Sequence, residues 1–206
     1  MALNVNSADK WEADYLHGGD GWDLGGPTPA FRSFLVNGGL SPGKMLVVCA
    51  GRGYDAREFA RYGYQVTAVD FSPYAAREMG RLADSGAPVE ILQQDLFTLS
   101  NDLDGYFDYV LEYTCYCAID PKRRTEFVDL VARLLKPGGM YISLAYPLTR
   151  KQGGPPFGVT VSELVHLFQE RGFKLIERGQ PSESVPRRRG AEELLFFQKN
   201  PAPGSA

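Results

Sequence analysis

A buried strand, a glycine-rich turn and a helix follow one another directly near residue 50, and this succession constrains the fold most. The run KMLVVCA over 44–50 is continuously apolar, as expected for a strand buried on both faces of a parallel sheet. The turn GRGYD follows, and in the next segment Ala56, Phe59 and Ala60 share one helical face. The run YQVTAVD over 64–70 predicts a second strand, which completes a strand–helix–strand unit.

The same alternation continues to the end of the chain. Further helices are predicted over 72–86, 120–135 and 160–172, and further strands over 88–95, 106–113, 140–146, 173–179 and 192–198. Ser72 and Asp120 suit helix N-caps, and a proline follows each of them at the first helical position. This pattern is typical of an α/β fold, a parallel sheet with helices on both faces, and we expect the last two strands to pair.

Length, charge and cysteine usage bound the function. The chain has 206 residues and a net charge of -3, which fits a single domain and suggests neither a nucleic-acid nor a membrane partner. We expect the basic run 187–189 to be solvated surface; the alternative is that it borders the mouth of the pocket and favours anionic acceptors. We expect the end of the chain, 200–206, to be a flexible tail. Three cysteines without zinc-ligand spacing favour a reducing, cytoplasmic location and no metal site. A monomer is the default expectation, because the sequence alone locates no exposed apolar patch.

Glycines and an acidic residue stand where the first two predicted strands end. Gly51, Gly53 and Ala56 satisfy the G-x-G-x-x-G/A pattern, directly after a strand and at the start of a helix. Asp70 ends the second strand, where a carboxylate can accept the hydrogens of both ribose hydroxyls. Together these residues predict a ligand that carries a nucleoside. The alternative for Asp70 is a capping role at the helix that starts at Pro73.

Acidic residues also follow the third and fourth strands. Asp95 and Leu96 suit an adenine, because a carboxylate can meet its amine and apolar groups its faces. Glu112 could hold an ammonium group, or it is a salt-bridged residue at the sheet end. A dinucleotide would need a second mononucleotide-binding half, for which the chain is short. The pattern therefore favours S-adenosylmethionine, which has a ribose, an adenine and an amino-acid head but no phosphate.

Several longer motifs resemble the thiopurine S-methyltransferase superfamily, in particular its halide and thiol methyltransferase branch. They are WEADYLHGGDGWDLGGPTP, AGRGYDAREFARYGYQVTAVDFSPYA, CAIDPKRR, LLKPGGMYISLAYPLT and GGPPFGVTVSEL, within a likeness that runs from about Trp11 to about Lys199. The resemblance implies a Rossmann-like class I methyltransferase fold, with a mostly parallel seven-stranded sheet, an antiparallel C-terminal strand and an N-terminal lid over 1–30.

The resemblance also implies a set of site residues and a cofactor, S-adenosylmethionine. The residues expected to bind the cofactor are Trp11, Tyr15, Trp22, Cys49, Gly51, Asp70, Asp95, Leu96 and Glu112. The three aromatic residues would close the pocket, and Tyr146 would lie near the transferable methyl group. Because a phenol is a poor base near neutral pH, we expect Tyr146 to orient the acceptor rather than take a proton from it.

The sequence departs from the family pattern in places. The family's G-C-G reads Cys49-Ala50-Gly51 here, the second aromatic of the N-terminal pattern is Tyr15, and the segment after the fourth strand, EYTCYCAIDP, differs beside the acceptor pocket. Cys115 and Cys117 in that segment are interpreted as pocket wall or buried thiols.

The expected reaction is in-line methyl transfer to a small thiol or thiolate, with a halide as a further acceptor. Bisulfide, thiocyanate, thiopurines and sulfur-bearing metabolites all stay open as acceptors. The alternatives are an O- or N-methyltransferase of a small metabolite on the same cofactor site, a nicotinamide-dependent oxidoreductase and a non-catalytic nucleoside-binding module. An oxygen or nitrogen acceptor would need a clearer general base than the sequence offers.

Overall fold

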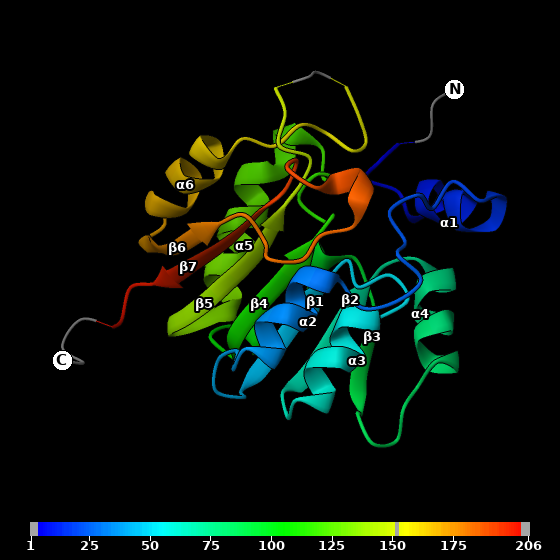
Figure 1. The fold of residues 1–206 in the computed structure, drawn as a ribbon, viewed down its shortest axis with the longest axis horizontal. Coiled ribbons are helices and arrows are strands. Elements are labelled where there is room, and N and C mark those ends of the chain that lie inside the picture. The colour runs from blue at the N-terminus through cyan, green and yellow to red at the C-terminus, as the bar shows by residue number, and fades with distance from the viewer. Residues whose placement is uncertain (1–3, 151–152, 203–206) are drawn as a thin grey trace.

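One twisted sheet of seven strands runs through a computed structural model that describes residues 4–150 and 153–202 (Figure 1). The strands are β1 Lys44–Val48, β2 Gln65–Asp70, β3 Val89–Gln93, β4 Phe107–Tyr113, β5 Leu135–Ala145, β6 Phe173–Gly179 and β7 Glu193–Lys199. Their order in the sheet is β3-β2-β1-β4-β5-β7-β6. The pairs among β1 to β5 are parallel, and β7 runs antiparallel to both neighbours. The predicted fold class and the pairing of the last two strands are confirmed.

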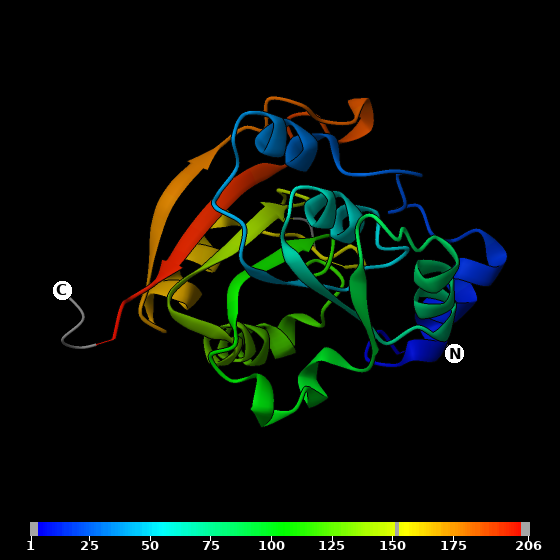
Figure 2. The same ribbon diagram turned by 90° about the horizontal axis from the view of Figure 1, so that it is seen from below.

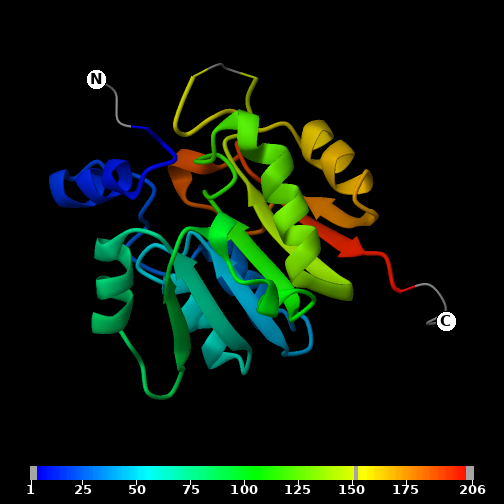
Figure 3. The same ribbon diagram turned by 180° about the vertical axis from the view of Figure 1, so that it is seen from behind.

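Helices cover both faces of this sheet (Figures 2 and 3). They are α1 Ala8–His17, α2 Pro29–Val36, α3 Tyr54–Arg61, α4 Pro73–Arg81, α5 Arg124–Leu134 and α6 Val161–Gln169, with short 3-10 helices η1 Leu96–Thr98, η2 Asn101–Leu103, η3 Pro121–Arg123 and η4 Pro186–Arg188. Figure 2 shows α2 and α3 on one side and α5 on the other, and Figure 3 shows α5 and α6 together.

The alternation of side chains along β1 explains this two-sided arrangement. Met45 and Val47 pack with α2 and α3 in one hydrophobic cluster, whereas Leu46 and Val48 pack with α5 and α6 in the other. All four side chains are buried, so the continuous apolar run of β1 reflects a central strand covered on both faces.

The structure corrects three predicted boundaries. The helix expected over 72–86 ends at Arg81, because residues after it form a turn in which Asp84 accepts from the N–H of Gly86. The helix expected from Asp120 begins as η3, and Asp120 caps that 3-10 turn instead. The fifth strand begins at Leu135 rather than 140, since Leu135 pairs with Phe107 before the register shifts.

Two helices near the N-terminus were not predicted. α1 has its N-cap at Ser7, whose hydroxyl accepts from the N–H of Asp9, and it ends at Gly18 in the left-handed conformation. α2 begins at Pro29 directly after the glycine-rich segment. The expected lid, 1–30, therefore consists of residues 4–7, α1, the loop 18–28 and the first two residues of α2; residues 1–3 lie outside the described part. Of the expected tail, 203–206 lies outside it as well.

Segments from distant parts of the chain gather where the parallel strands end. In Figure 1, α1 and the loop after it, the loop after β5 and the β6–β7 connection with η4 all lie at this end of the molecule. Among the described residues, no helix combines the length and the apolar character needed to cross a membrane.

Candidate functional site

A cavity of about 510 Å³ lies at the carboxyl ends of the parallel strands. Eight of the predicted site residues line it: Trp11, Tyr15, Trp22, Cys49, Asp70, Asp95, Leu96 and Tyr146. Its size is in the range of small-molecule and cofactor sites, and its place is where ligands of open α/β sheets bind.

The turn after β1 approaches the cavity through its backbone. Gly51 and Gly53 have φ of +55° and +69°, in the left-handed region that favours glycine. A Cβ on Gly53 would lie 2.7 Å from Cγ of Met79, so the close packing of this turn on α4 needs a glycine. Cys49 has φ of +48° at the position where the related family has its first glycine. This turn therefore keeps a glycine-like backbone although the first glycine is replaced.

Gly51 lies beside a second, smaller cavity of about 70 Å³. Tyr15, Trp22, Cys49 and Thr114 line both cavities, so the two adjoin. A Cβ on Gly51 would lie 3.1 Å from the hydroxyl of Tyr15. The backbone of the turn and the side chain of Tyr15 are therefore in close contact where the two cavities adjoin.

Asp70 holds the end of β2 to this turn. One carboxylate oxygen accepts from the N–H of Gly51 at 2.9 Å, and the other accepts from the N–H of Ser72 at 3.0 Å. Burial raises the pKa of this carboxyl group above its ordinary value. Asp70 does not cap α4, because the hydroxyl of Ser72 does so by accepting from the N–H of Ala75. Its carboxylate is a fixed acceptor at the cavity wall.

The loop after β3 supplies a polar edge next to apolar walls. Asp95 caps η1, and its Oδ1 accepts from the N–H of Phe97 at 3.0 Å. Leu96, Phe97 and Ile119 line the cavity nearby. The guanidinium carbon of Arg123 lies 3.6 Å from the centre of the Phe97 ring. This arrangement fits a planar heteroaromatic ring that carries an amine.

Three aromatic side chains from the N-terminal segment meet over the cavity. The ring centre of Trp22 lies 5.4 Å from that of Trp11 and 5.4 Å from that of Tyr15, in edge-to-face contacts. Tyr15 also stacks on Tyr74 of α4 at 5.0 Å. The large side chain of Trp22, inside a loop rich in glycine, therefore packs against α1 and forms part of the cavity wall.

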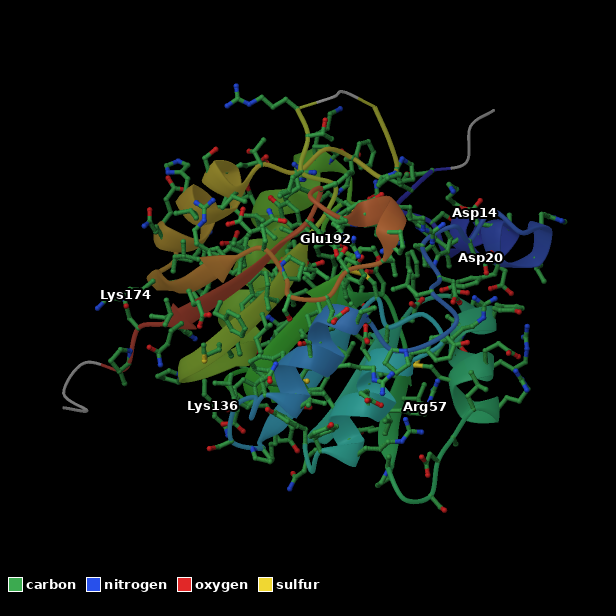
Figure 4. All side chains as sticks on the ribbon, in the orientation of Figure 1. Asp14, Asp20, Arg57, Lys136, Lys174 and Glu192 are labelled. Carbon is green, nitrogen blue, oxygen red and sulfur yellow. A yellow bond between two sulfur atoms is a disulfide. The ribbon has the colours of Figure 1, made fainter. Side chains whose placement is uncertain are left out.

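Charged groups hold this N-terminal segment in place. Arg52, from the glycine turn, forms ion pairs with Asp20 at 2.8 Å and with Asp23. Glu12 of α1 accepts from the hydroxyl of Ser72 and from the N–H of Tyr74, at the start of α4. Figure 4 shows Asp14 and Asp20 on the side of the molecule where α1 lies above α4. The cluster of Trp11, Tyr15 and Trp22, which we call the aromatic cover, is thus tied to the two loops that follow β1 and β2.

The β6–β7 connection contacts the same segment from the other side. Arg187 donates to the carbonyl oxygen of Gly21 at 2.8 Å, and Arg188 donates to that of Trp22 at 2.9 Å. The expectation that 187–189 is solvated surface is wrong for Arg188, which is 2% exposed. The alternative, that the run borders the pocket, is confirmed for Arg187 and Arg188, which line the larger cavity. The fold returns the β6–β7 connection to the carboxyl ends of the parallel strands, and the composition of the run does not show this.

Arg188 lies beside Tyr146, the residue expected near the acceptor. Its guanidinium carbon is 4.8 Å from the ring centre of Tyr146 and 5.0 Å from that of Tyr113. The Tyr113 hydroxyl donates to a carboxylate oxygen of Glu192 at 2.7 Å, and burial raises the pKa of Tyr113. Figure 4 labels Glu192 in the interior, near η4. This corner of the cavity therefore combines aromatic faces with a buried cation.

Glu112 does not line either cavity. One oxygen of its carboxylate accepts from the N–H of Tyr116 at 3.1 Å, and the other accepts from the hydroxyl of Ser143. The side chain is 2% exposed, and burial raises its pKa. The structure thus brings Glu112 to the end of β4, as its sequence position implies, but directs its carboxylate to protein partners.

The cysteines differ from the expectation of buried thiols. Cys49 at the end of β1 and Cys115 after β4 form a disulfide bond. Cys117 is a free, buried thiol on the cavity wall, and burial raises its pKa to about 12. The interpretation of Cys117 as pocket wall is confirmed, whereas Cys115 as a thiol is wrong. Within the described residues, no group of histidine, cysteine and acidic side chains could hold a metal ion.

Comparisons with known proteins show the family of the chain. The profile of the thiopurine S-methyltransferase family matches residues 6–200. The Arabidopsis thaliana protein named probable thiol methyltransferase 2 is 32% identical over 201 residues, which cover 96% of this chain and 88% of that protein. Thiocyanate methyltransferase 1 of Brassica oleracea is 31% identical over 193 residues, or 92% of this chain and 84% of the relative.

Solved structures show the same fold. The Burkholderia thailandensis 1,6-didemethyltoxoflavin-N1-methyltransferase, solved with S-adenosylhomocysteine, superposes with a TM-score of 0.72 at 22% identity. The match covers 94% of this chain and 87% of that one.

Proposed function

Because the chain belongs to the thiopurine S-methyltransferase family, we propose that it transfers the methyl group of S-adenosylmethionine to the sulfur of a small thiol, thiolate or thiocyanate. A halide is a further acceptor of the same kind. The relatives named for thiol and thiocyanate methylation cover nearly the whole chain, which supports sulfur as the acceptor atom.

The donor groups of the cavity fit S-adenosylmethionine. Asp70 would accept the hydrogens of the ribose hydroxyls, and Asp95 with Leu96 would hold the adenine against the apolar wall. The backbone of the turn at Gly51 and the wall at Cys49 would lie along the methionine part. The bound cofactor supplies a methyl group on a positively charged sulfur, which leaves as S-adenosylhomocysteine.

The aromatic cover fits that positive charge. Trp11, Tyr15 and Trp22 meet in one cluster on the cavity wall, and aromatic faces attract cations. The same side chains would exclude water from the acceptor, which strengthens the nucleophile. In-line transfer needs the attacking atom about 3–3.5 Å from the methyl carbon, so alignment is the main task of the protein.

One observation favours an acceptor that brings its own negative charge. Among the described residues that line the larger cavity there is no histidine, and its carboxylates already have protein partners: Asp14 pairs with Lys10, and Asp70 and Asp95 accept from backbone N–H groups. The guanidinium carbon of Arg188 lies 4.8 Å from the ring centre of Tyr146, and Thr114 and Cys117 line the same cavity. The pKa of the Cys117 thiol, about 12, makes it a poor base at neutral pH. A thiolate or thiocyanate needs no base, whereas a hydroxyl or amine acceptor does. Tyr146 would orient the acceptor through its hydroxyl.

Cytoplasmic location and a monomeric state belong to the same proposal. They rest on the length and composition of the chain alone, and the disulfide between Cys49 and Cys115 removes the support that the cysteine count gave to a reducing compartment.

A turnover panel tests the proposed function. The protein would be given S-adenosylmethionine with bisulfide, an aryl thiol, thiocyanate, iodide or a catechol, and S-adenosylhomocysteine would be measured. We expect turnover with the sulfur acceptors and little with the catechol. Cofactor binding with turnover of the catechol alone would favour the O-methyltransferase alternative. No binding of S-adenosylhomocysteine at all would contradict the cofactor assignment.

A further inference from the structure

The guanidinium of Arg188 carries a hydrogen-bond donor that the protein does not use. Four buried side-chain atoms among the described residues have no hydrogen-bond partner: Tyr116 Oη, Arg124 Nε, Tyr141 Oη and Arg188 Nη1. Of these residues, Arg188 alone lines the larger cavity. Unsatisfied buried donors are rare in folded proteins, and one on a cavity wall points to a ligand as its partner.

The positive charge of Arg188 has no ion-pair partner either, and the buried carboxylate of Glu192 is linked to it only through Tyr113, whose hydroxyl donates to Glu192 and whose ring lies beside the guanidinium. The other buried arginine of this group, Arg124, pairs with Glu163 at 3.0 Å. No carboxylate among the described residues lies within ion-pair distance of Arg188. Burying an unpaired charge is costly, and the two tyrosine faces offset only part of that cost. A negative charge in the cavity would remove the imbalance.

The same guanidinium also holds the aromatic cover. Nη2 of Arg188 donates to the carbonyl oxygen of Trp22, whereas Nη1 of the same planar guanidinium group has no hydrogen-bond partner. An anion bound at Nη1 would fix the orientation of the planar guanidinium group and therefore the hydrogen bond from Nη2 to Trp22. Acceptor binding and closure of the cover would then be coupled through one side chain.

We propose that Arg188 recognises the negative charge of the methyl acceptor through Nη1 and, through Nη2 and Trp22, couples acceptor binding to closure of the cover. This inference rests on the proposed function and adds a specificity-determining residue to it. The acceptor class is a small, weakly hydrated monoanion, such as thiocyanate or a thiolate, because guanidinium is itself weakly hydrated and the cavity corner is largely aromatic.

The change of charge during the reaction determines which kinetic constant Arg188 affects. The bond from the acceptor sulfur to the methyl carbon forms as the bond from that carbon to the sulfonium breaks. An anion and a cation are thereby converted into two products without those charges. Since the methylated product no longer pairs with Arg188, the residue favours the substrate over the product. We therefore expect its removal to act mainly on KM rather than on kcat.

Calorimetry with the complex of protein and S-adenosylhomocysteine tests this assignment, with thiocyanate as the probe. No methyl group is present, so only binding is measured. We expect R188M to bind thiocyanate roughly 10- to 100-fold more weakly, the worth of a hydrogen bond to a charged group. R188K keeps the positive charge but not the planar guanidinium group, and we expect its affinity for thiocyanate to lie between those of the wild type and R188M. The matched control is R189M, which removes the same charge from the next, exposed position; it should bind as the wild type does.

Closure of the cover has its own readout. Hydrogen exchange of a peptide spanning 18–29 would be followed with S-adenosylhomocysteine, with and without thiocyanate. We expect thiocyanate to slow exchange in the wild type and in R189M, but not in R188M. Equal thiocyanate affinity of R188M and R189M, no thiocyanate binding by the wild-type complex, or equal protection in all variants would overturn the inference. Loss of S-adenosylhomocysteine binding by the wild type would instead contradict the proposed function, so the two failures are distinguishable.

Discussion

Asp70 links the end of β2 to the glycine turn, and it is the single residue on which cofactor recognition most depends. Its oxygens accept from the N–H groups of Gly51 and Ser72, and it also lines the larger cavity. Sequence position alone indicated this residue, because a carboxylate directly after the second strand is a local signal. For Arg188 the basic run 187–189 left two interpretations open, solvated surface or the border of the pocket, and the β6–β7 connection brings the residue to the cavity.

Asp70→Asn tests the ribose assignment. An amide offers one acceptor oxygen in place of two charged ones, so we expect S-adenosylhomocysteine to bind roughly 10- to 100-fold more weakly. Calorimetry measures this, and thermal unfolding checks that the variant is folded. The exposed Asp102→Asn is the control with the same chemical change. Unchanged affinity of the Asp70 variant would mean that the ribose binds elsewhere.

At the scale of elements, the N-terminal segment is held on the sheet by contacts from three loops. Arg52 pairs with Asp20 and Asp23, and Arg187 and Arg188 donate to carbonyl oxygens of the loop. The loop itself has little regular structure, because its composition of glycines and prolines favours turns. Its position is therefore set by these anchors and by the aromatic cluster.

Trp22→Ala removes the centre of that cluster. Trp22 is half-buried, so its removal should weaken the packing of the aromatic cover by a free energy of roughly 1–2 kcal/mol. We therefore expect kcat/KM for a thiol acceptor to fall about ten-fold. Trp22→Phe should restore part of the activity, because it restores part of the packing. The exposed Leu16→Ala on α1 is the control. Full activity of Trp22→Ala in steady-state assays would show that the cover has no part in catalysis.

Asp55 of α3 ties the end of the loop to the helix layer and makes stability depend on pH. It accepts from the N–H and the hydroxyl of Thr28, both at 2.7 Å, yet burial raises its pKa to about 6. The folded state thus holds a proton that the unfolded state releases. The stability from this group is present at low pH and is lost as the pH rises through 6.

Comparison with Asp55→Asn isolates this effect. Relative to the variant, we expect the wild type to lose about 1 kcal/mol of unfolding free energy between pH 5 and pH 7. Urea unfolding of both proteins at several pH values measures the difference. A constant difference across that range would mean that Asp55 is ionised throughout.

For the whole molecule, the sheet order brings β1 and β4 side by side, and a disulfide joins the segments that follow them. Cys49 and Cys115 are 66 residues apart in the chain but have Cα atoms 5.4 Å apart. Cys117 lies two residues further on and remains a thiol. The cross-link therefore closes a long loop at the carboxyl end of the sheet, next to the cavity that Cys49 lines.

Thiol titration of the unfolded protein tests the cross-link. We expect one reactive thiol without reductant and all three cysteines after reduction. Reduction should lower the free energy of unfolding, by about 4 kcal/mol on the chain-entropy estimate for a loop of this length. Cys117→Ser should respond to reductant as the wild type does, and Cys115→Ala should not respond. Three reactive thiols before reduction would show that the bond is absent.

The α/β class, the strand ends at Gly51, Asp70 and Asp95, and the aromatic pattern of the N-terminal segment could all be predicted before the structure was known. These are local signals, because apolar runs, caps and turn residues act on their immediate neighbours. The folded chain was needed to show that Cys49 is bonded to Cys115, that the Glu112 carboxylate accepts from Ser143, and that Arg188 lines the cavity. Each of these contacts depends on which distant segments the order of the strands brings together. Burial then makes an unpaired charge or hydrogen-bond donor costly, which the sequence of a single segment does not show.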